Sequence, residues 1–221
     1  MKLFLNAFIK FCLGIVLVGV LVFLPAMTFN YPGGWLFMAL LFTPMIIMGA
    51  VMLIKSPDLL KRRLEAKEEK GTERGVVALS GLVFLLGFIL SSFDFRYDWS
   101  SVPLWLTIVS SALFLVGYGI YAEVMRENAY LSRTVKVSEN QTVITGGLYA
   151  VVRHPMYLAT LLMFLPIPLI LGSFFGLIPF ALYPFLIAVR ILDEEKLLTK
   201  ELLGYAEYKN KTKFRLIPFI W

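Results

Sequence analysis

The sequence predicts an all-α integral membrane protein of about six transmembrane helices, ending in a helical hairpin and an amphipathic cytoplasmic tail helix. Hydrophobic residues make up 59% of the 221 positions, against about 45–50% in soluble domains. Apolar runs recur along the chain, and a run of roughly 20 such residues can cross a bilayer. Lys and Arg are also confined to alternate connecting segments, as in multi-pass membrane proteins.

Six apolar runs account for the predicted helices in order: 8–29, 35–54, 76–93, 102–124, 155–171 and 174–191. The sequence N-Y-P-G-G predicts a turn between the first two runs. Only Gly-Ser separates the last two runs, so we expect a tight hairpin there. Because proline lacks a backbone donor, Pro166, Pro168, Pro179 and Pro184 predict kinks within this hairpin.

The distribution of basic residues predicts the orientation. The N-terminus, the second and fourth connections and the C-terminal tail contain every Lys and Arg except Arg96. By the positive-inside rule these segments are cytoplasmic, so we expect both termini on the cytoplasmic side of an even number of helices. The first apolar run is long enough to span and no A-x-A-like site follows it, so we interpret it as a helix rather than a cleaved signal.

Two regions differ in their polar residues. Residues 1–125 contain few ionisable groups within the spans and are interpreted as a transmembrane scaffold of about four helices with a charged cytoplasmic loop at 55–75. Within that loop, Leu59, Leu60 and Leu64 share one helical face, which predicts a surface helix lying at the headgroups. Residues 126–221 contain most candidate functional groups and are interpreted as the region that carries the chemistry.

The tail from 190 to 208 is too polar to span a membrane. Its apolar residues Ile191, Leu198, Leu202 and Tyr205 recur at helical spacing, with Glu195 on the same stripe. Arg190 and Glu194 lie one turn apart on the neighbouring line. We therefore expect the last helix to leave the membrane and to continue amphipathically.

Several classes of site are disfavoured. One histidine, His154, and one cysteine, Cys12, cannot form a zinc site of usual composition, and a carboxylate-only magnesium site at 193–195 has little support. The chain has no P-loop and no dinucleotide-binding fingerprint. We therefore expect no metal. The net charge of +6 is explained by the basic membrane loops, so we also expect no nucleic-acid partner.

The stretch Y-A-V-V-R-H-P-M-Y at 149–157 is the strongest candidate for a binding site. Arg153 and His154 precede Pro155, which suits the first position of a helix whose free N–H groups favour an anion. Tyr149 and Tyr157 could stack on a flat ring. In the tail, Glu194 or Glu195 could accept hydrogen bonds from a ribose diol, and Arg190 could hold a carboxylate.

Each of these features also has a structural interpretation. An Arg-His pair at a helix end can be an interfacial anchor, and adjacent glutamates on an amphipathic helix can be a solvated face. Their occurrence together, in this order and on one predicted side, favours a site for an anionic or zwitterionic small molecule at the membrane surface.

The runs T-G-G-L-Y-A-V-V-R-H-P-M-Y, R-I-L-D-E-E-K-L-L, G-Y-A-E-Y and R-L-I-P-F-I-W together resemble the isoprenylcysteine carboxyl methyltransferase family. The resemblance covers roughly residues 126–221. The bacterial and archaeal branch of that family also tends to contain E-N, D-x-R and P-L-x-L-G-S, found here near 127–128, 94–96 and 168–173. One departure is Gly147, where the family usually has proline; we expect the turn to survive with less rigidity.

This resemblance implies an integral membrane methyltransferase that uses S-adenosylmethionine. The family's substrate-orienting arginine corresponds to Arg190 in this sequence. We also assign a catalytic role to Arg153, the donor that precedes His154. The implied cofactor-binding residues, to which we add the adjacent Glu195, are Gln141, Thr142, Val143, Ile144, Tyr149, His154, Pro155, Met156, Tyr157, Glu194 and Glu195.

The expected acceptor is lipophilic, either a small molecule or a prenylated group in contact with membrane lipid. A carboxylate acceptor, as in isoprenylcysteine O-methylation, would need no general base, which fits the absence of an obvious base in the sequence. Phospholipid N-methylation and thiol S-methylation are alternatives on the same architecture. An NADPH-dependent enzyme similar to sterol reductases and a non-catalytic membrane protein are alternatives of other classes.

Overall fold

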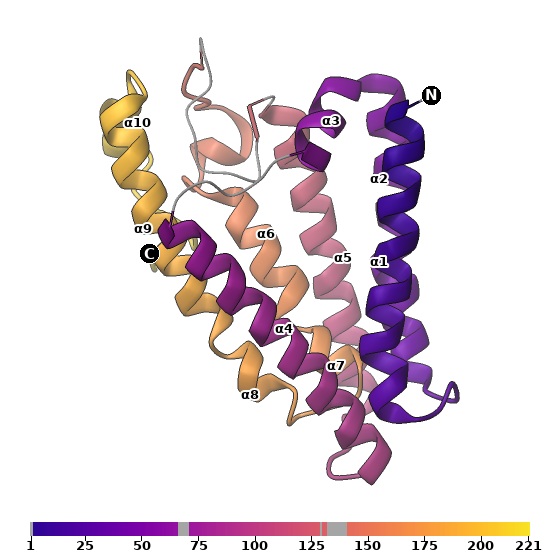
Figure 1. Cartoon of the computed structure of the whole chain (residues 1–221). Coiled ribbons are helices and arrows are strands. Elements are labelled where there is room, and N and C mark those ends of the chain that lie inside the picture. Colours follow the sequence, from indigo (N-terminus) through magenta and orange to yellow (C-terminus); the bar gives the residue numbers. More distant parts are fainter. Residues whose placement is uncertain (1, 66–70, 129, 132–140) are drawn as a thin grey trace.

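The protein is described by a computed structural model that covers residues 2–65, 71–128, 130–131 and 141–221 (Figure 1). These residues form α-helices and one short 3-10 helix, and none of them lies in a β-strand. The predicted all-α fold class is therefore confirmed.

Four helices of the described chain are long and apolar enough to cross a membrane. They are α1 (Lys2–Ala26), α2 (Pro32–Lys55), α4 (Gly71–Tyr97) and α5 (Leu104–Glu127), and they contain the first four predicted spans apart from a few end residues. Pro32 occupies the first turn of α2 and Pro103 is the N-cap residue of α5, positions where the missing proline N–H removes no helical hydrogen bond.

The C-terminal hairpin is more broken than the sequence predicted. Its first arm consists of α6 (Pro155–Phe164) and α7 (Ile167–Ile170), and its second arm of α8 (Leu177–Phe180) and α9 (Tyr183–Glu201). Two of the four predicted kinks coincide with interruptions, at Pro166 and just before Pro184, whereas Pro168 and Pro179 lie within the short helices α7 and α8. Because the apolar stretch Pro155–Ile170 is shorter than the four long helices, the total of six membrane crossings stays a prediction.

Two further helices lie outside these spans. The expected surface helix is found as α3 (Pro57–Glu65), where Leu59 and Leu60 are buried; residues 66–70 of that loop lie outside the described residues. The amphipathic tail expected over 190–208 is helical but divided, because α9 ends at Glu201 and α10 (Tyr205–Lys211) starts after Gly204. Gly204 adopts a left-handed φ of 83°, which glycine permits without strain.

At two glycines of the long helices, the absence of a side chain lets the C-terminal hairpin pack closely. A Cβ at Gly117 of α5 would lie 2.7 Å from the Met163 side chain of α6, and one at Gly87 of α4 would lie 2.2 Å from the Phe180 ring of α8. Phe84 of α4 also meets the rings of Phe164 and Phe180 edge to face. These contacts fix the C-terminal hairpin to the bundle.

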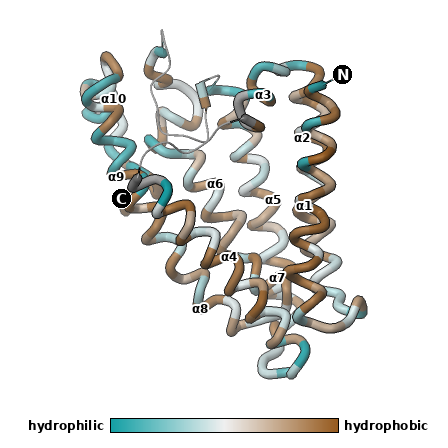
Figure 2. Tube along the Cα trace, viewed as in Figure 1, coloured by the Kyte–Doolittle hydropathy of each residue, from teal (hydrophilic) through white to brown (hydrophobic). Residues whose placement is uncertain are grey.

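The outward faces of the long helices are apolar. Leu13, Leu17 and Leu24 of α1 are each more than 60% exposed, as is the surface-facing Ile54 of α2 at 82%. Figure 2 shows hydrophobic residues along the lengths of the helices and hydrophilic residues gathered near the two ends of the molecule. Continuous exposed apolar surface of this kind fits a bilayer environment rather than water.

The two ends of the molecule carry different parts of the chain. The N-terminus, α3 and α10 lie at one end, and the connections between α1 and α2 and between α4 and α5 lie at the other (Figure 1). This arrangement places the segments that are rich in Lys and Arg together, as the orientation prediction requires. The assignment of that end to the cytoplasm stays a prediction.

A buried carboxylate organises the end opposite the N-terminus. Asp94 is fully buried and accepts hydrogen bonds from the Ser100 backbone N–H at 2.7 Å, from the Ser100 hydroxyl at 2.6 Å and from the Ser173 hydroxyl. Nearby, the Tyr31 hydroxyl donates to the Leu171 carbonyl at 2.7 Å. The end of α4 is thus tied to the loop after it and to the hairpin turn, which brings together the D-x-R and L-G-S motifs.

We expect Asp94→Asn to destabilise the protein. The amide places a donor against the Ser100 and Ser173 donors, so buried hydrogen bonds are lost at a cost of about 1–3 kcal/mol. Thermal unfolding of the purified protein measures the change. Asp98→Asn is the matched control, because Asp98 is exposed and asparagine tolerates its left-handed backbone; equal shifts for the two variants would refute the structural role of Asp94.

Candidate functional site

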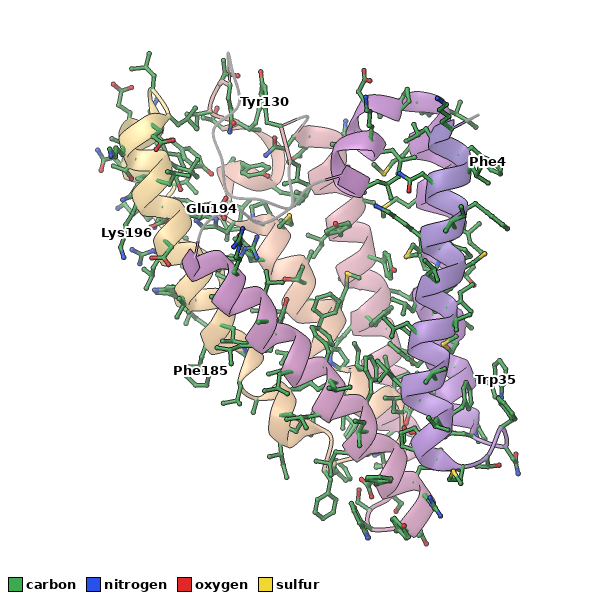
Figure 3. The ribbon with its side chains drawn as sticks, in the orientation of Figure 1. Phe4, Trp35, Tyr130, Phe185, Glu194 and Lys196 are labelled. Atoms are coloured by element: carbon green, nitrogen blue, oxygen red, sulfur yellow. The ribbon has the colours of Figure 1, made fainter. Side chains whose placement is uncertain are left out.

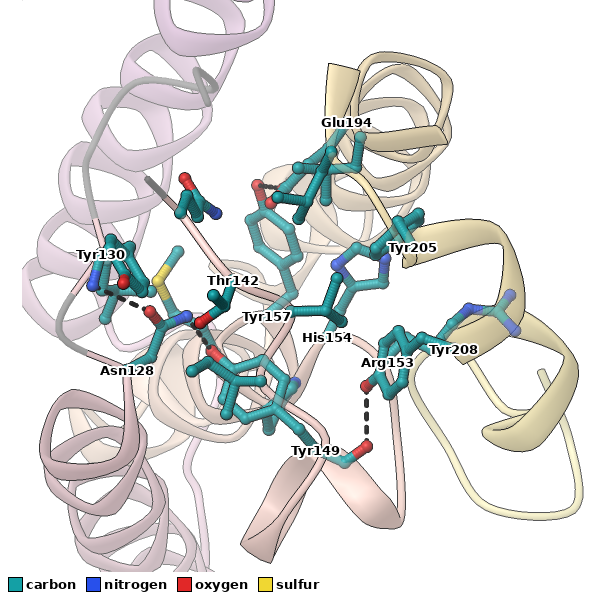
Figure 4. Close-up of a pocket in the computed structure, with 18 of the residues that line it drawn as sticks. Asn128, Tyr130, Thr142, Tyr149, Arg153, His154, Tyr157, Glu194, Tyr205 and Tyr208 are labelled. Atoms are coloured by element: carbon teal, nitrogen blue, oxygen red, sulfur yellow. Dashed lines mark hydrogen bonds between the residues drawn. The ribbon is translucent and has the colours of Figure 1, made fainter. Parts of the chain in front are cut away.

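A pocket of about 860 Å³, including its open mouth, lies at the end of the molecule that carries α10 (Figure 4). It is enclosed by the residues after α5, the segment 141–144, the 3-10 helix η1 (Gly147–Ala150) with the start of α6, and the facing sides of α9 and α10.

The structure brings nearly all predicted site residues to this pocket. They come from three separate segments and line it together: Gln141, Thr142, Val143, Ile144, Tyr149, Arg153, His154, Pro155, Met156, Tyr157, Arg190 and Glu194. Glu195 is the exception and is not part of the lining. Segments that are about 50 residues apart in sequence therefore share one cavity, as the co-occurrence of the motifs suggested.

A chain of polar groups forms the α9 wall of the pocket. The Tyr157 hydroxyl donates to Glu194 Oε2 at 2.6 Å, and Arg190 Nε donates to the same hydroxyl oxygen at 3.1 Å. Arg190 and Glu194 are one helical turn apart on α9, so both side chains reach Tyr157 on α6. A cation and an anion are thus held next to each other on one wall of the pocket.

The turn that presents Tyr149 depends on the carboxylate and amide that follow α5. Glu127 accepts the Leu148 backbone N–H at 3.0 Å, and the Asn128 amide donates to the Tyr149 hydroxyl at 2.8 Å. Gly147 has a φ of 55°, and a Cβ there would lie 1.6 Å from a Glu127 carboxylate oxygen. Proline is fixed near −65°, so this conformation explains why glycine replaces the proline usual in the similar family.

Arg153 and Glu195 pair beneath the pocket. Glu195 is 4% exposed, and its carboxylate accepts from Arg153 Nε at 2.6 Å and from Arg215 Nε at 3.0 Å, with His154 Nε2 at 3.4 Å. Arg153 also donates to the Thr212 and Lys213 carbonyls. Burial alone would raise the pKa of Glu195, but the hydrogen bonds from His154, Arg215 and Arg153 together lower it to about 2.

The chain after α10 completes the support of this region. The backbone N–H groups of Arg153 and His154 donate to the Phe214 and Arg215 carbonyls, each at 2.9 Å. The Tyr208 hydroxyl donates to the Tyr149 carbonyl at 2.7 Å. His154 is thereby held directly before Pro155, the first residue of α6, which confirms the predicted helix start.

With this geometry in view, the comparison with known families becomes informative. The model of the phospholipid methyltransferase family matches residues 105–206. The match supports a methyltransferase of the membrane. The matched residues run from α5 to the start of α10 and include every predicted site residue. No curated protein matches the chain.

Further lining residues of this methyltransferase-like region were not assigned to the site from the sequence. They are Asn128, Tyr130, Leu131, Leu198, Leu202, Tyr205 and Tyr208. Asn128 belongs to the E-N motif, Tyr205 and Tyr208 belong to the G-Y-x-x-Y motif, and Leu198, Leu202 and Tyr205 belong to the apolar stripe of the tail. Leu198 and Leu202 reach the pocket from the end of α9, whereas Tyr205 and Tyr208 reach it from α10, after a break at Gly204 that helical periodicity alone does not predict.

Tyr205 has an unsatisfied group at the pocket wall. Its hydroxyl is buried and has no hydrogen-bond partner within the described part of the chain. Burial, followed by the nearby Glu195 and Glu194 carboxylates, raises the pKa of this phenol, so it stays protonated and keeps a donor. Buried polar groups usually find a partner, and here a bound ligand can provide one.

We expect Glu195→Gln to destabilise the protein at neutral pH by about 3 kcal/mol, because buried Arg153 loses its counter-charge. The pKa of about 2 lies below the ordinary 4.5, so the stabilisation by charged Glu195 is complete above 4.5 and is lost as pH falls toward 2. Thermal unfolding across this range should show the gap between wild type and variant narrowing as pH falls.

Asp193→Asn is the control for this prediction. Asp193 pairs with the exposed Lys196 at 3.2 Å on the same helix, and exposed pairs contribute only about 0–1 kcal/mol. A Glu195→Gln variant as stable as Asp193→Asn at neutral pH would show that the buried cluster does not support the fold.

Proposed function

We propose that this protein is an S-adenosylmethionine-dependent methyltransferase that methylates a lipophilic acceptor drawn from the membrane. The observation that carries the proposal is the pocket itself. Within the region matched by a methyltransferase family, it combines the Glu194 carboxylate, a Tyr205 hydroxyl that has no partner among the described residues, and aromatic and aliphatic side chains. When bound, the cofactor supplies an electrophilic methyl group on a sulfonium.

The lining residues fit this cofactor by their chemistry. Glu194 would accept hydrogen bonds from the ribose hydroxyls, since one of its oxygens already takes the Tyr157 hydroxyl and the carboxylate has further lone pairs. The Tyr205 hydroxyl would gain its missing partner. Val143, Ile144 and Met156, which pack with the buried Tyr149, would cover the flat base, and the segment 141–144 would offer backbone groups to it.

Arg153 and Glu195 act indirectly in this proposal. Both are buried and hydrogen-bonded to each other, so we assign the pair a supporting role. Their effect is to fix His154 at the start of α6 and to keep the pocket floor rigid. This role replaces the catalytic function considered for Arg153 and the cofactor contact considered for Glu195.

We further propose a carboxylate as the acceptor, as in the isoprenylcysteine family that the motifs resemble. Arg190 presents a guanidinium at the pocket wall next to Tyr157, and a guanidinium attracts and orients a carboxylate. A carboxylate is already a nucleophile at neutral pH, so no base is required. The chain then contributes positioning and exclusion of water, which can lower a barrier by about 7–11 kcal/mol when geometry is good.

A phospholipid amine is the second candidate acceptor, and the observation that favours it is the phospholipid methyltransferase description of the matched family. An amine must lose a proton before or during transfer. Among the described lining residues, Glu194 and His154 have lone pairs that could receive it. The Arg190 cation, in contrast, would repel an ammonium group.

The acceptor can be determined by incubating the purified protein with methyl-labelled S-adenosylmethionine and either a prenylcysteine or phosphatidylethanolamine. We expect label in the prenylcysteine, released as methanol by alkali because methyl esters are base-labile. Alkali-stable label in phosphatidylethanolamine would instead establish amine methylation and overturn the carboxylate assignment. Transfer to neither acceptor, in protein that binds the cofactor, would overturn both.

We expect Glu194→Gln to weaken binding of S-adenosylhomocysteine about tenfold or more, because hydrogen bonds to a charged acceptor are worth about 1.5–3 kcal/mol. Isothermal titration calorimetry measures the affinity. Glu201→Gln is the control, since Glu201 is exposed at the end of the same helix. Unchanged affinity in Glu194→Gln would refute the cofactor site, and binding of NADPH alone would favour a reductase.

A further inference from the structure

The side of α9 that faces away from the pocket carries a second concavity. We call it the basic groove. Its lining residues are Leu192, Glu195, Lys196, Thr199 and Lys200 of α9, Lys209 of α10, and Arg215 of the tail, so four cations surround a single carboxylate. Its volume is about 780 Å³, including its open side. Figure 3 shows Lys196 on the outer side of α9 and Glu194 on the side facing the other helices, so the basic groove and the pocket are separate.

The charges of the basic groove are only partly compensated. Lys196 pairs with Asp193 at 3.2 Å, and Arg215 uses Nε to contact Glu195, which is already shared with Arg153. Lys200 and Lys209 form no ion pair with any described residue. The Arg215 guanidinium lies over the Trp221 ring at 5.3 Å, and its terminal nitrogens form no hydrogen bond with a described residue. Cations from three segments thus converge on one concave surface, a suitable place for an anion.

An exposed apolar stripe leads directly into this groove. Phe185, Val189 and Leu192 are 70%, 45% and 42% exposed, and their spacing of four and then three residues places them on one face of α9. Lys196 follows four residues later on the same face, and Leu192 also borders the groove. The helix therefore presents hydrocarbon surface that ends at a cluster of cations.

We propose that the basic groove binds the phosphate of an anionic phospholipid whose acyl chain lies along the apolar stripe. A soluble anion would not contact the apolar stripe, and a hydrocarbon chain alone would not pair with the lysines. The inference does not depend on the proposed methyl transfer, because none of Lys196, Lys200 and Lys209 lines the pocket. The bound lipid would nevertheless meet Arg215, which contacts the buried Glu195 under the pocket.

The site can be tested by native mass spectrometry of the purified full-length protein with phosphatidylglycerol added. We expect the double variant Lys200→Glu/Lys209→Glu to bind this lipid about tenfold or more weakly, because two cations that attract the anionic headgroup are replaced by anions. Lys61→Glu/Lys211→Glu is the matched control. It makes the same change in net charge at exposed positions outside the groove and should bind as the wild type does.

Three results would overturn the proposal. Equal loss of binding in both double variants would indicate general charge attraction. Equal affinity of the wild type for phosphatidylcholine would show that the cations do not select the headgroup. Displacement of phosphatidylglycerol by inorganic phosphate at comparable concentration would identify a soluble anion, rather than a lipid, as the occupant.

Discussion

The buried carboxylate of Glu195 is the constraint on which the site end of the molecule depends. A charge removed from water is stable only when it is paired and hydrogen-bonded, and α9 by itself offers Glu195 no cation at this position. Its partners come from the loop before α6 and from the segment after α10. To satisfy this one side chain, the tail must return beside the loop, and that return fixes His154 and closes the pocket floor.

A similar arrangement operates at the opposite end of the bundle. Asp94 gathers Ser100 and the hairpin residue Ser173 around a second buried carboxylate. Apart from the two acids, the helices are held by apolar contacts, which are non-directional, and by hydrogen bonds from the Ser92 and Tyr118 hydroxyls to the Val22 and Leu41 carbonyls, at 2.7 and 2.8 Å. The aromatic contacts of Phe84 and the close approach at Gly117 fix the distance between helices, while the two carboxylates fix where the loops meet.

Within about two turns, helix α9 presents side chains to three different surroundings. Arg190 and Glu194 face the pocket, Glu195 points into the buried cluster, and Lys196 lies on the outer side toward the basic groove. Successive residues of a helix point about 100° apart, so neighbours serve different surfaces. This explains how two adjacent glutamates have different surroundings: one accepts from the pocket tyrosine Tyr157, and the other is enclosed by two arginines and a histidine.

The sequence by itself determined the helical class, the four long helices and the identity of most residues that line the pocket, because hydrophobic run length and short motifs are local properties. Only the tertiary structure decided that Glu195 lies beneath the pocket and Glu194 beside it, since periodicity places both on α9 without showing what each meets. The break at Gly204, the orientation of Tyr205 and the reason for Gly147 likewise depend on the approach of distant segments, which no local pattern records.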